Sequence, residues 1–231
     1  MNWTIIGCGW LGISLGENLV LEGNRVKGSS RSTNNDKALA SKGIENFVFE
    51  LNSQISMDII DFTDVLVLSI PPFDRSNSKK YGFALTELVK QFNLNTRFIF
   101  LGSTGVYPQK SGVFSETYQF VDTEKENSLY QAEIQLSNEL KERLTIVRLG
   151  GLFGNDRHPI YTISGKTDLK NPNGIINFAG KSDIINALKL IVKRNVFGET
   201  FNVVNPDHPT RQEYYSIKAQ DLNLVVPTFV S

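Results

Sequence analysis

Residues 5–12 read IIGCGWLG, in which three glycines follow a short β-type run at the spacing G-x-G-x-x-G. A helical pattern begins at Trp10 or Leu11, directly after the second glycine. Strand, glycine loop and helix in this order are typical of a dinucleotide-binding βα unit, because the helix N-terminus offers N–H donors and a positive dipole end to a pyrophosphate. An ordinary strand–turn–helix with glycines required by its backbone is the alternative. We interpret residues 5–12 as a dinucleotide loop.

Each glycine of this loop has a different steric role in a dinucleotide site. Gly7 would make the tight turn, Gly9 would let the backbone approach the pyrophosphate, and Gly12 would let the helix pack near the strand. The thiol of Cys8 and the indole of Trp10 are explained more simply by packing than by a redox role. We expect cofactor contacts along the whole loop, from Gly7, Cys8, Gly9, Trp10, Leu11 and Gly12.

Apolar β-type runs alternate with helical patterns up to about residue 204. The expected strands are 3–7, 25–28, 46–49, 64–70, 97–101, 144–149 and 200–204, and the expected helices are 11–21, 36–40, 81–91, 124–140 and 183–193. Continuous apolar runs such as DVLVLSI are typical of strands that are buried on both faces of a parallel sheet. The pattern predicts an α/β fold of the Rossmann type, with a doubly wound parallel sheet.

Three long segments interrupt this alternation: 102–123, 150–175 and the chain after residue 205. Long connections at the carboxyl ends of parallel strands are where ligands bind. We expect residues 1–154 together with 175–204 to form a nucleotide-binding Rossmann domain. Residues 155–174 and 205–231 are expected to form a small C-terminal substrate lobe.

The composition excludes several classes of partner. Lys and Arg number 24 and Asp and Glu number 24, without a block of like charge, so neither nucleic acid nor an anionic membrane is expected. One cysteine and two histidines give no disulfide and no metal-ligand spacing. The N-terminus lacks the basic segment and long apolar run of a secretory signal, and no run approaches the roughly 20 apolar residues of a membrane helix. We expect a cytoplasmic protein with a small-molecule substrate and no metal.

The end of the second expected strand bears on which nicotinamide nucleotide would bind. NAD sites usually carry Asp or Glu there, about 20 residues after the glycine loop. This chain reads VKGSSRS at 26–32 and has no acid. Arg31, with Ser30 beside it, would accept a 2′-phosphate through charge-assisted hydrogen bonds, unless Arg31 is only a solvated loop cation. NADP(H) is therefore favoured over NAD(H), with Ile70 and Pro71 expected in the wall beside the cofactor.

Further motifs resemble those of a known superfamily. LGSTGVYP at 101–108, SET at 115–117, RLGGLFG at 148–154 and FNVVNPDHP at 201–209 resemble the extended short-chain dehydrogenase/reductase superfamily, of the NAD-dependent epimerase/dehydratase type. IIGCGWLG, STGVY, RLGGLFGNDRHP and DHP-x-R are similar, more narrowly, to the atypical YeeZ-like group. The resemblance covers nearly the whole chain. It implies a Rossmann fold, a nicotinamide cofactor and a small polar or nucleotide-linked substrate.

The resemblance also implies catalytic residues. Ser103 matches the hydroxyl that bonds the reacting oxygen, and Tyr130 matches the general acid/base tyrosine. In the family a lysine four residues after this tyrosine favours the phenolate, which a phenol with an ordinary pKa near 10 needs at neutral pH. This chain has Ile134 there, so the dyad is broken. Tyr130 is then either an acid without its partner or an aromatic residue of an amphipathic helix.

Other residues are expected on the substrate side. Thr104 adjoins Ser103, and His158 and His208 lie in matching loop motifs that could meet at the open end of the sheet. Each histidine either contacts substrate or is a polar loop residue next to its proline. Arg148 would anchor a substrate anion or bond to backbone. The charged helix 124–140 presents a solvated face, and its apolar positions fit a homodimer as well as packing on the sheet.

Three functions are consistent with these residues. The first is an NADP(H)-dependent oxidoreductase or epimerase/dehydratase-like enzyme that uses Ser103, with Tyr130 or a histidine moving the proton. The second is a non-catalytic NAD(P)(H)-binding sensor, which the missing lysine favours. In the third the glycine loop is vestigial and the fold serves a structural role.

Overall fold

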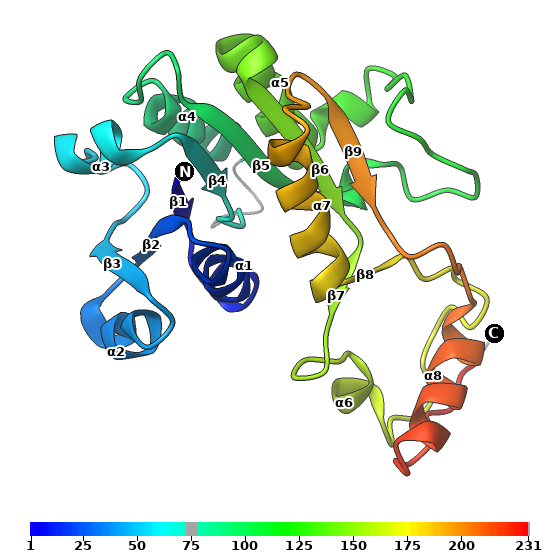
Figure 1. Ribbon diagram of the computed structural model, residues 1–231. Helices are drawn as coiled ribbons and strands as arrows, with labels where there is room; N and C mark the ends of the chain where they lie inside the picture. The colour runs from blue at the N-terminus through cyan, green and yellow to red at the C-terminus, as the bar shows by residue number, and fades with distance from the viewer. Residues whose placement is uncertain (73–77, 231) are drawn as a thin grey trace. The chain divides into compact units, whose positions relative to one another are not determined.

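The protein is described from a computed structural model that covers residues 1–72 and 78–230 (Figure 1). Its contacts divide the chain into two compact units, and each unit is built from two separate stretches of sequence. The first unit consists of Met1–Arg148 and Ile185–Asn202, and the second of Leu149–Ile184 and Val203–Ser231. The second unit thus also contains residues 149–154, 175–184 and 203–204. The domain boundaries expected from the sequence place these residues in the Rossmann domain.

A seven-stranded sheet forms the centre of the first unit (Figure 1). Its order is β3-β2-β1-β4-β5-β6-β9, and each neighbouring pair from β3 to β5 is parallel. The strands are β1 (Asn2–Ile6), β2 (Arg25–Ser30), β3 (Ile44–Val48), β4 (Val65–Leu68), β5 (Arg97–Ser103), β6 (Leu144–Leu149) and β9 (Thr200–Val203). The order reverses between β1 and β4, which is the position where doubly wound sheets bind ligands. This topology confirms the predicted Rossmann-type fold.

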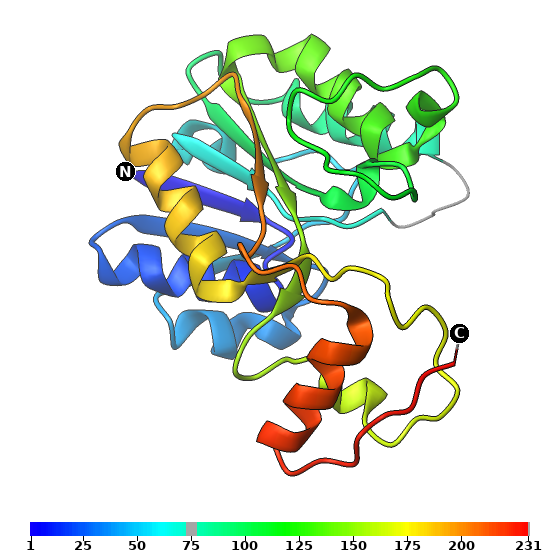
Figure 2. The same ribbon diagram turned by 90° about the vertical axis from the view of Figure 1, so that its right-hand side faces the viewer.

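Helices cover both faces of the sheet (Figure 2). One face carries α1 (Trp10–Leu21), α2 (Asp36–Ala40) and α7 (Lys181–Lys193), and the other carries α3 (Met57–Phe62), α4 (Ser78–Val89) and α5 (Ser128–Leu140). The second face buries a core in which Leu66, Phe98 and Phe100 pack against helical residues such as Leu85 and Leu136. Burial on both faces explains why the central strands are continuous apolar runs. None of the described helices is long and apolar enough to span a bilayer.

The second unit holds elements that the sequence did not predict. They are β7 (Gly151–Phe153), α6 (Ile160–Ile163), β8 (Phe178–Gly180) and α8 (Arg211–Asp221), and α3 in the first unit was also missed. β7 and β8 form a parallel pair, while Ile160, Phe178, Tyr215 and Ala219 make a small core. The 124–140 prediction was too long, because residues Glu124–Glu126 form a 3-10 turn before α5 begins at Ser128.

Candidate functional site

The glycine loop joins β1 to α1 within the first unit. Gly7 has φ +88°, and a Cβ there would lie 2.6 Å from the carbonyl oxygen of Ser69, so this turn requires glycine. A Cβ at Gly12 would lie 3.1 Å from Cγ2 of Ile5, which shows how closely α1 approaches the strand. Gly9 is the N-cap of α1, and a Cβ on it would meet no atom of the described residues within 4 Å, its chain neighbours aside. The first and third glycines therefore serve the fold, while the middle one leaves open space at the helix N-terminus.

A cavity of about 580 Å³ lies against this loop, a volume typical of sites for small molecules and cofactors. Trp10, Leu11 and Gly12 do not line the cavity, and the last two are buried. The other seven predicted cofactor residues do: its lining consists of Gly7, Cys8, Gly9, Ser29, Ser30, Arg31, Asn35, Phe49, Glu50, Leu51, Asn52, Ser69, Ile70, Pro71 and Pro72.

Hydrogen bonds fix the walls of the cavity. Ser29 at the end of β2 accepts from the Gly7 N–H through its hydroxyl and from the Cys8 N–H through its carbonyl, each at 2.9 Å. Burial raises the pKa of the Cys8 thiol to about 12, so the thiol is protonated at neutral pH and contributes packing. On the opposite wall the Tyr81 hydroxyl of α4 donates to the Ile70 carbonyl at 2.6 Å. The loop and the segment after β4 are thus each tied to a neighbouring element.

Polar side chains gather where β2 ends. Arg31 is exposed in the cavity lining and has no hydrogen-bond partner among the described residues. The Ser30 hydroxyl lies 2.6 Å from the Ser32 carbonyl oxygen and 2.9 Å from Oδ1 of Asn46. Asn46 of β3 in turn donates through Nδ2 to the carboxylate of Asp36. Arg31 in the lining therefore has no partner among the described residues, while the carboxylate of Asp36, outside the lining, is hydrogen-bonded to Asn46.

Ser103 and Tyr130 both lie in the first unit, on β5 and α5. The Ser103 hydroxyl oxygen accepts from the Gly105 N–H at 3.0 Å, in the 3-10 turn that starts at Thr104. The Tyr130 ring stacks on Phe120, with 4.1 Å between ring centroids and 29° between planes. Ile134, one turn later on α5, is 39% exposed. The lysine position of the family motif is thus a surface position here.

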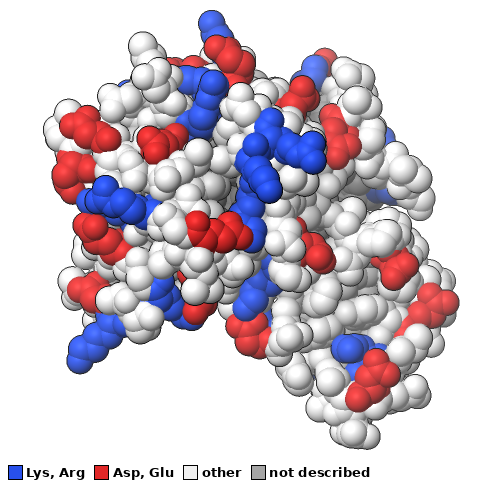
Figure 3. Space-filling view, in the orientation of Figure 1, with Lys and Arg blue, Asp and Glu red and all other residues white. Residues whose placement is uncertain are grey.

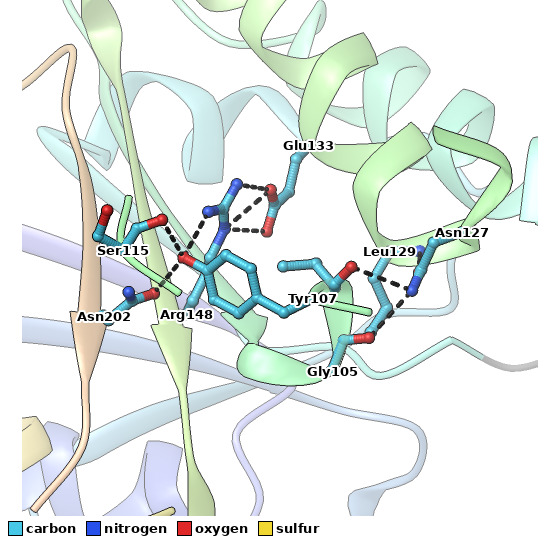
Figure 4. Close-up of polar contacts among 9 residues, drawn as sticks. Gly105, Tyr107, Ser115, Asn127, Leu129, Glu133, Arg148 and Asn202 are labelled. Carbon is cyan, nitrogen blue, oxygen red and sulfur yellow. Dashed lines mark hydrogen bonds and ion pairs between the residues drawn. The ribbon is translucent and has the colours of Figure 1, made fainter. Parts of the chain in front are cut away.

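A buried ion pair next to these residues was missed by the sequence reasoning (Figure 4). Arg148 of β6 is 4% exposed and donates through Nε and a terminal nitrogen to Glu133 of α5, at 2.7–3.2 Å. We expected Arg148 to anchor a substrate anion or to bond to backbone, and its pairing with Glu133 shows that this expectation is wrong. We also expected the charges of helix 124–140 to be solvated, and this is wrong for Glu133. A signal was available, since Glu133 shares a helix face with the apolar positions Ala132, Leu136 and Leu140.

Burial and pairing act in opposite directions on these two groups. Burial raises the pKa of the Glu133 carboxyl, while the hydrogen bonds and charge of Arg148 oppose that rise. For Arg148 burial disfavours the charged form, but the hydrogen bonds and charge of Glu133 outweigh it and raise the guanidinium pKa. The bidentate geometry holds the two side chains as a charged pair.

Tyr107 extends this network toward the edge of the sheet (Figure 4). Its hydroxyl accepts from Arg148 at 2.9 Å and lies 3.0 Å from the Ser115 carbonyl oxygen and 2.9 Å from Oδ1 of Asn202. The Asn202 N–H donates to Glu116 at 2.6 Å. The STGVY and SET motifs therefore hold the long 102–123 connection against β9, which is a structural role.

The two histidines lie in the second unit and do not bond each other. His158 Nδ1 accepts from the Ile160 N–H at 3.0 Å, and its Nε2 lies 2.8 Å from the Tyr214 hydroxyl of α8. Because Nδ1 is an acceptor, the neutral ring carries its proton on Nε2 and donates it to Tyr214. Burial, followed by the charge of Lys218, lowers the pKa of His158. His208 is exposed in the loop before α8.

Charged side chains of both signs are visible on one face of the molecule (Figure 3). Lys, Arg, Asp and Glu side chains are interspersed on the face drawn in Figure 3. Among the described residues, no three His, Cys, Asp or Glu side chains are grouped as metal ligands.

Comparisons with known proteins support the assignment that the motifs suggest. A scan against models of protein families gives no match. Protein YeeZ of Escherichia coli (strain K12) is 30% identical over 234 residues, which cover 97% of this chain and 85% of YeeZ. A functionally unknown conserved protein from Silicibacter pomeroyi has a solved structure with a TM-score of 0.77, 22% identity, and coverage of 100% of this chain and 82% of that one.

A dTDP-glucose 4,6-dehydratase from Bacillus anthracis, solved in complex with NAD, has a TM-score of 0.77 at 16% identity, over 100% of this chain and 84% of that one. At this identity the likeness concerns the fold. The fold, the glycine loop and the identity to YeeZ along almost the full chain agree with one another. The chain belongs to the YeeZ family.

Proposed function

We propose that this protein is an NADP(H)-dependent oxidoreductase of the epimerase/dehydratase type, acting on a small polar or nucleotide-linked substrate. The observation that carries the proposal is the cavity at the glycine loop, with open space over Gly9 and, in its lining, Arg31 without a partner among the described residues. The solved dehydratase with the same fold was in complex with NAD and acts on a nucleotide sugar, which supports a nicotinamide nucleotide and a substrate of that kind here.

The residues present fit such a cofactor. The open space at Gly9 and the N-terminus of α1 suit a pyrophosphate, which needs close backbone approach and N–H donors. Arg31 suits a 2′-phosphate, and Phe49, Leu51 and Ile70 offer apolar wall. A nicotinamide nucleotide supplies hydride transfer when bound. We assign its binding to Gly7, Gly9, Ser30, Arg31, Ile70 and Pro71.

Ser103 is proposed to orient the reacting oxygen of the substrate. In the bond to the Gly105 N–H its oxygen is the acceptor, so the hydroxyl proton can still be donated. Tyr130 is proposed to exchange a proton with the same oxygen, with its ring fixed on Phe120. Without a lysine at 134, Tyr130 lacks the partner that the family motif supplies, so we expect slow turnover. Thr104, His158 and His208 remain proposed substrate contacts.

Cofactor binding can be tested by titrating the protein with NADPH and NADH and following tryptophan fluorescence. Arg31→Ala should raise the Kd for NADPH about tenfold or more and leave the Kd for NADH nearly unchanged, because only NADPH carries the extra phosphate. Lys37→Ala, which removes an exposed cation of α2 outside the cavity lining, is the matched control. An equal loss of affinity for both nucleotides would refute the assignment of Arg31 to the 2′-phosphate. If neither nucleotide gave a saturable signal, the glycine loop would be vestigial.

A non-catalytic NADP(H)-binding sensor is the second candidate, and the exposed Ile134 at the lysine position favours it. A panel of carbonyl substrates with NADPH separates the two. The enzyme predicts NADPH oxidation that Ser103→Ala and Tyr130→Phe both reduce strongly, whereas the sensor predicts saturable binding without turnover. Turnover that neither substitution changes would mean that these are not the catalytic residues. A homodimer built on α5 stays a prediction, which sedimentation would test.

A further inference from the structure

We infer that Asn46 is a specificity-determining residue of the cofactor cavity, because it holds the carboxylate of Asp36 in a hydrogen bond and so keeps the Arg31 end of the cavity open to a phosphate. The inference rests on the proposed NADP(H) function and deepens it. Neither Asn46 nor Asp36 lines the cavity, so both act through their neighbours. Their role is one of positioning.

The contacts form a relay across three elements. Asn46 sits on β3 opposite Gly28 of β2, and its amide oxygen faces the Ser30 hydroxyl at 2.9 Å. The Asp36 carboxylate at the start of α2 can only accept, so the amide nitrogen of Asn46 faces it. The amide oxygen then faces the Ser30 hydroxyl, which also contacts the Ser32 carbonyl oxygen. The relay therefore spans the loop that contains Arg31 and Asn35, the two lining residues between β2 and α2.

Charge decides what the relay does for a nucleotide. Arg31 is the only cation among the described lining residues, and Asp36 follows it by five positions. Asp36 is exposed, and among the described residues the hydrogen bond that restrains its carboxylate comes from Asn46. A released carboxylate would either pair with Arg31 or face the 2′-phosphate, and both outcomes oppose the binding of that phosphate. A ribose 2′-hydroxyl carries no charge and would be little affected.

The test compares Kd values for NADPH and NADH across a double-mutant cycle in the full-length protein at one ionic strength. The variants are Asn46→Ala, Asp36→Asn and the double substitution. Asn46→Ala should weaken NADPH binding about tenfold and change NADH binding less than about twofold, since the released charge acts only on the phosphate. The double variant should return NADPH affinity to within about threefold of the wild type, because its residue 36 carries no charge.

Two further variants serve as a substitute for Asn46→Ala and as a control. Asn46→Thr suits a strand, cannot reach Asp36 with its hydroxyl, and replaces Asn46→Ala if the latter does not fold. Asn138→Ala removes an exposed amide from α5 and should change neither Kd. Equal weakening of both nucleotides, or no recovery in the double variant, would overturn the inference alone. A wild-type protein that binds neither nucleotide, or prefers NADH, would overturn the proposed NADP(H) function and the inference with it.

Discussion

Arg148 and Glu133 show what one buried charge requires of its neighbours. Each is almost fully buried, with 5% and 2% of the side chain exposed, and the desolvation of two ions is offset only while both are present. Glu133 also lies close behind the backbone of β5, since a Cβ at Gly102 would be 3.0 Å from its Oε1. The pair thus joins α5, β5 and β6 just before Ser103.

Breaking this pair should cost much more than replacing it. Arg148→Met leaves a buried carboxylate without its partner and should lower the free energy of unfolding by about 3–5 kcal/mol. The double variant Arg148→Met/Glu133→Leu should recover most of that loss, because an apolar pair pays no desolvation. Urea denaturation measures both. Losses that simply add in the double variant would show that the two side chains do not depend on each other.

His158 makes stability depend on pH in the second unit. Its pKa is lowered in the fold, chiefly by burial, while the unfolded side chain titrates at about 6.5. Below that pH the unfolded chain binds the proton more readily, so this contribution to stability is complete above about pH 6.5 and is lost as the pH falls. Protonation of Nδ1 would also remove its bond to the Ile160 N–H.

We therefore expect the free energy of unfolding to fall as the pH drops below about 6.5, and to fall less steeply in His158→Gln. Urea titrations at several pH values would measure the slope. His208→Gln, which changes an exposed loop residue, is the control. A His158→Gln slope identical to that of the wild type would contradict the assignment.

At the scale of elements, the sheet was predictable and the second unit was not. β4 is an apolar run buried along its whole length, which is a strong local signal. The elements of the second unit are short, and β7 and β8 have only three residues each, so no periodicity can develop. Their stability comes from contacts between distant stretches, which a sequence pattern does not reveal.

The candidate site divides in the same way. The glycine loop, Arg31 and Ile70 could be placed in one cavity because a motif and its spacing identify them. Asn46 could not, because its role depends on the register of β3 against β2. The burial of Glu133 was missed for a different reason: a charged residue on an amphipathic helix is usually solvated, so the general rule predicted an exposed side chain.

α8 did have a local signal, in the capping box that opens it. The Thr210 hydroxyl accepts from the Glu213 N–H at 3.3 Å, and the Glu213 carboxylate accepts from the Thr210 N–H at 3.1 Å. Thr210→Ala should lower the free energy of unfolding by about 1 kcal/mol, while Thr210→Ser, which keeps the hydroxyl, should cost less than half of that. Urea denaturation compares the two. Equal losses would mean that the methyl group matters and the cap does not.

At the scale of the molecule, all residues that line the cavity belong to the first unit. The core of the second unit depends on α8, which supplies Tyr215 and Ala219 to it. Nucleotide binding and the integrity of the second unit are therefore separable properties.

Deleting 206–231 tests this separation. The truncated protein should bind NADPH within about threefold of the full-length Kd, because every lining residue is retained. Residues 149–184 should lose protection against hydrogen exchange, since Ile160 and Phe178 lose their partners on α8. Loss of NADPH binding in a chain that keeps its sheet would contradict the independence of the two units.

The interleaving of the two units also orders events on the ribosome. The sheet up to β6 can form as the nascent chain emerges, but α7 and β9 are synthesised only after the 149–184 stretch of the second unit. That stretch in turn lacks its core partners Tyr215 and Ala219 until α8 has been synthesised. The stretches of the two units alternate along the chain, so synthesis of the second unit begins before the first unit is complete.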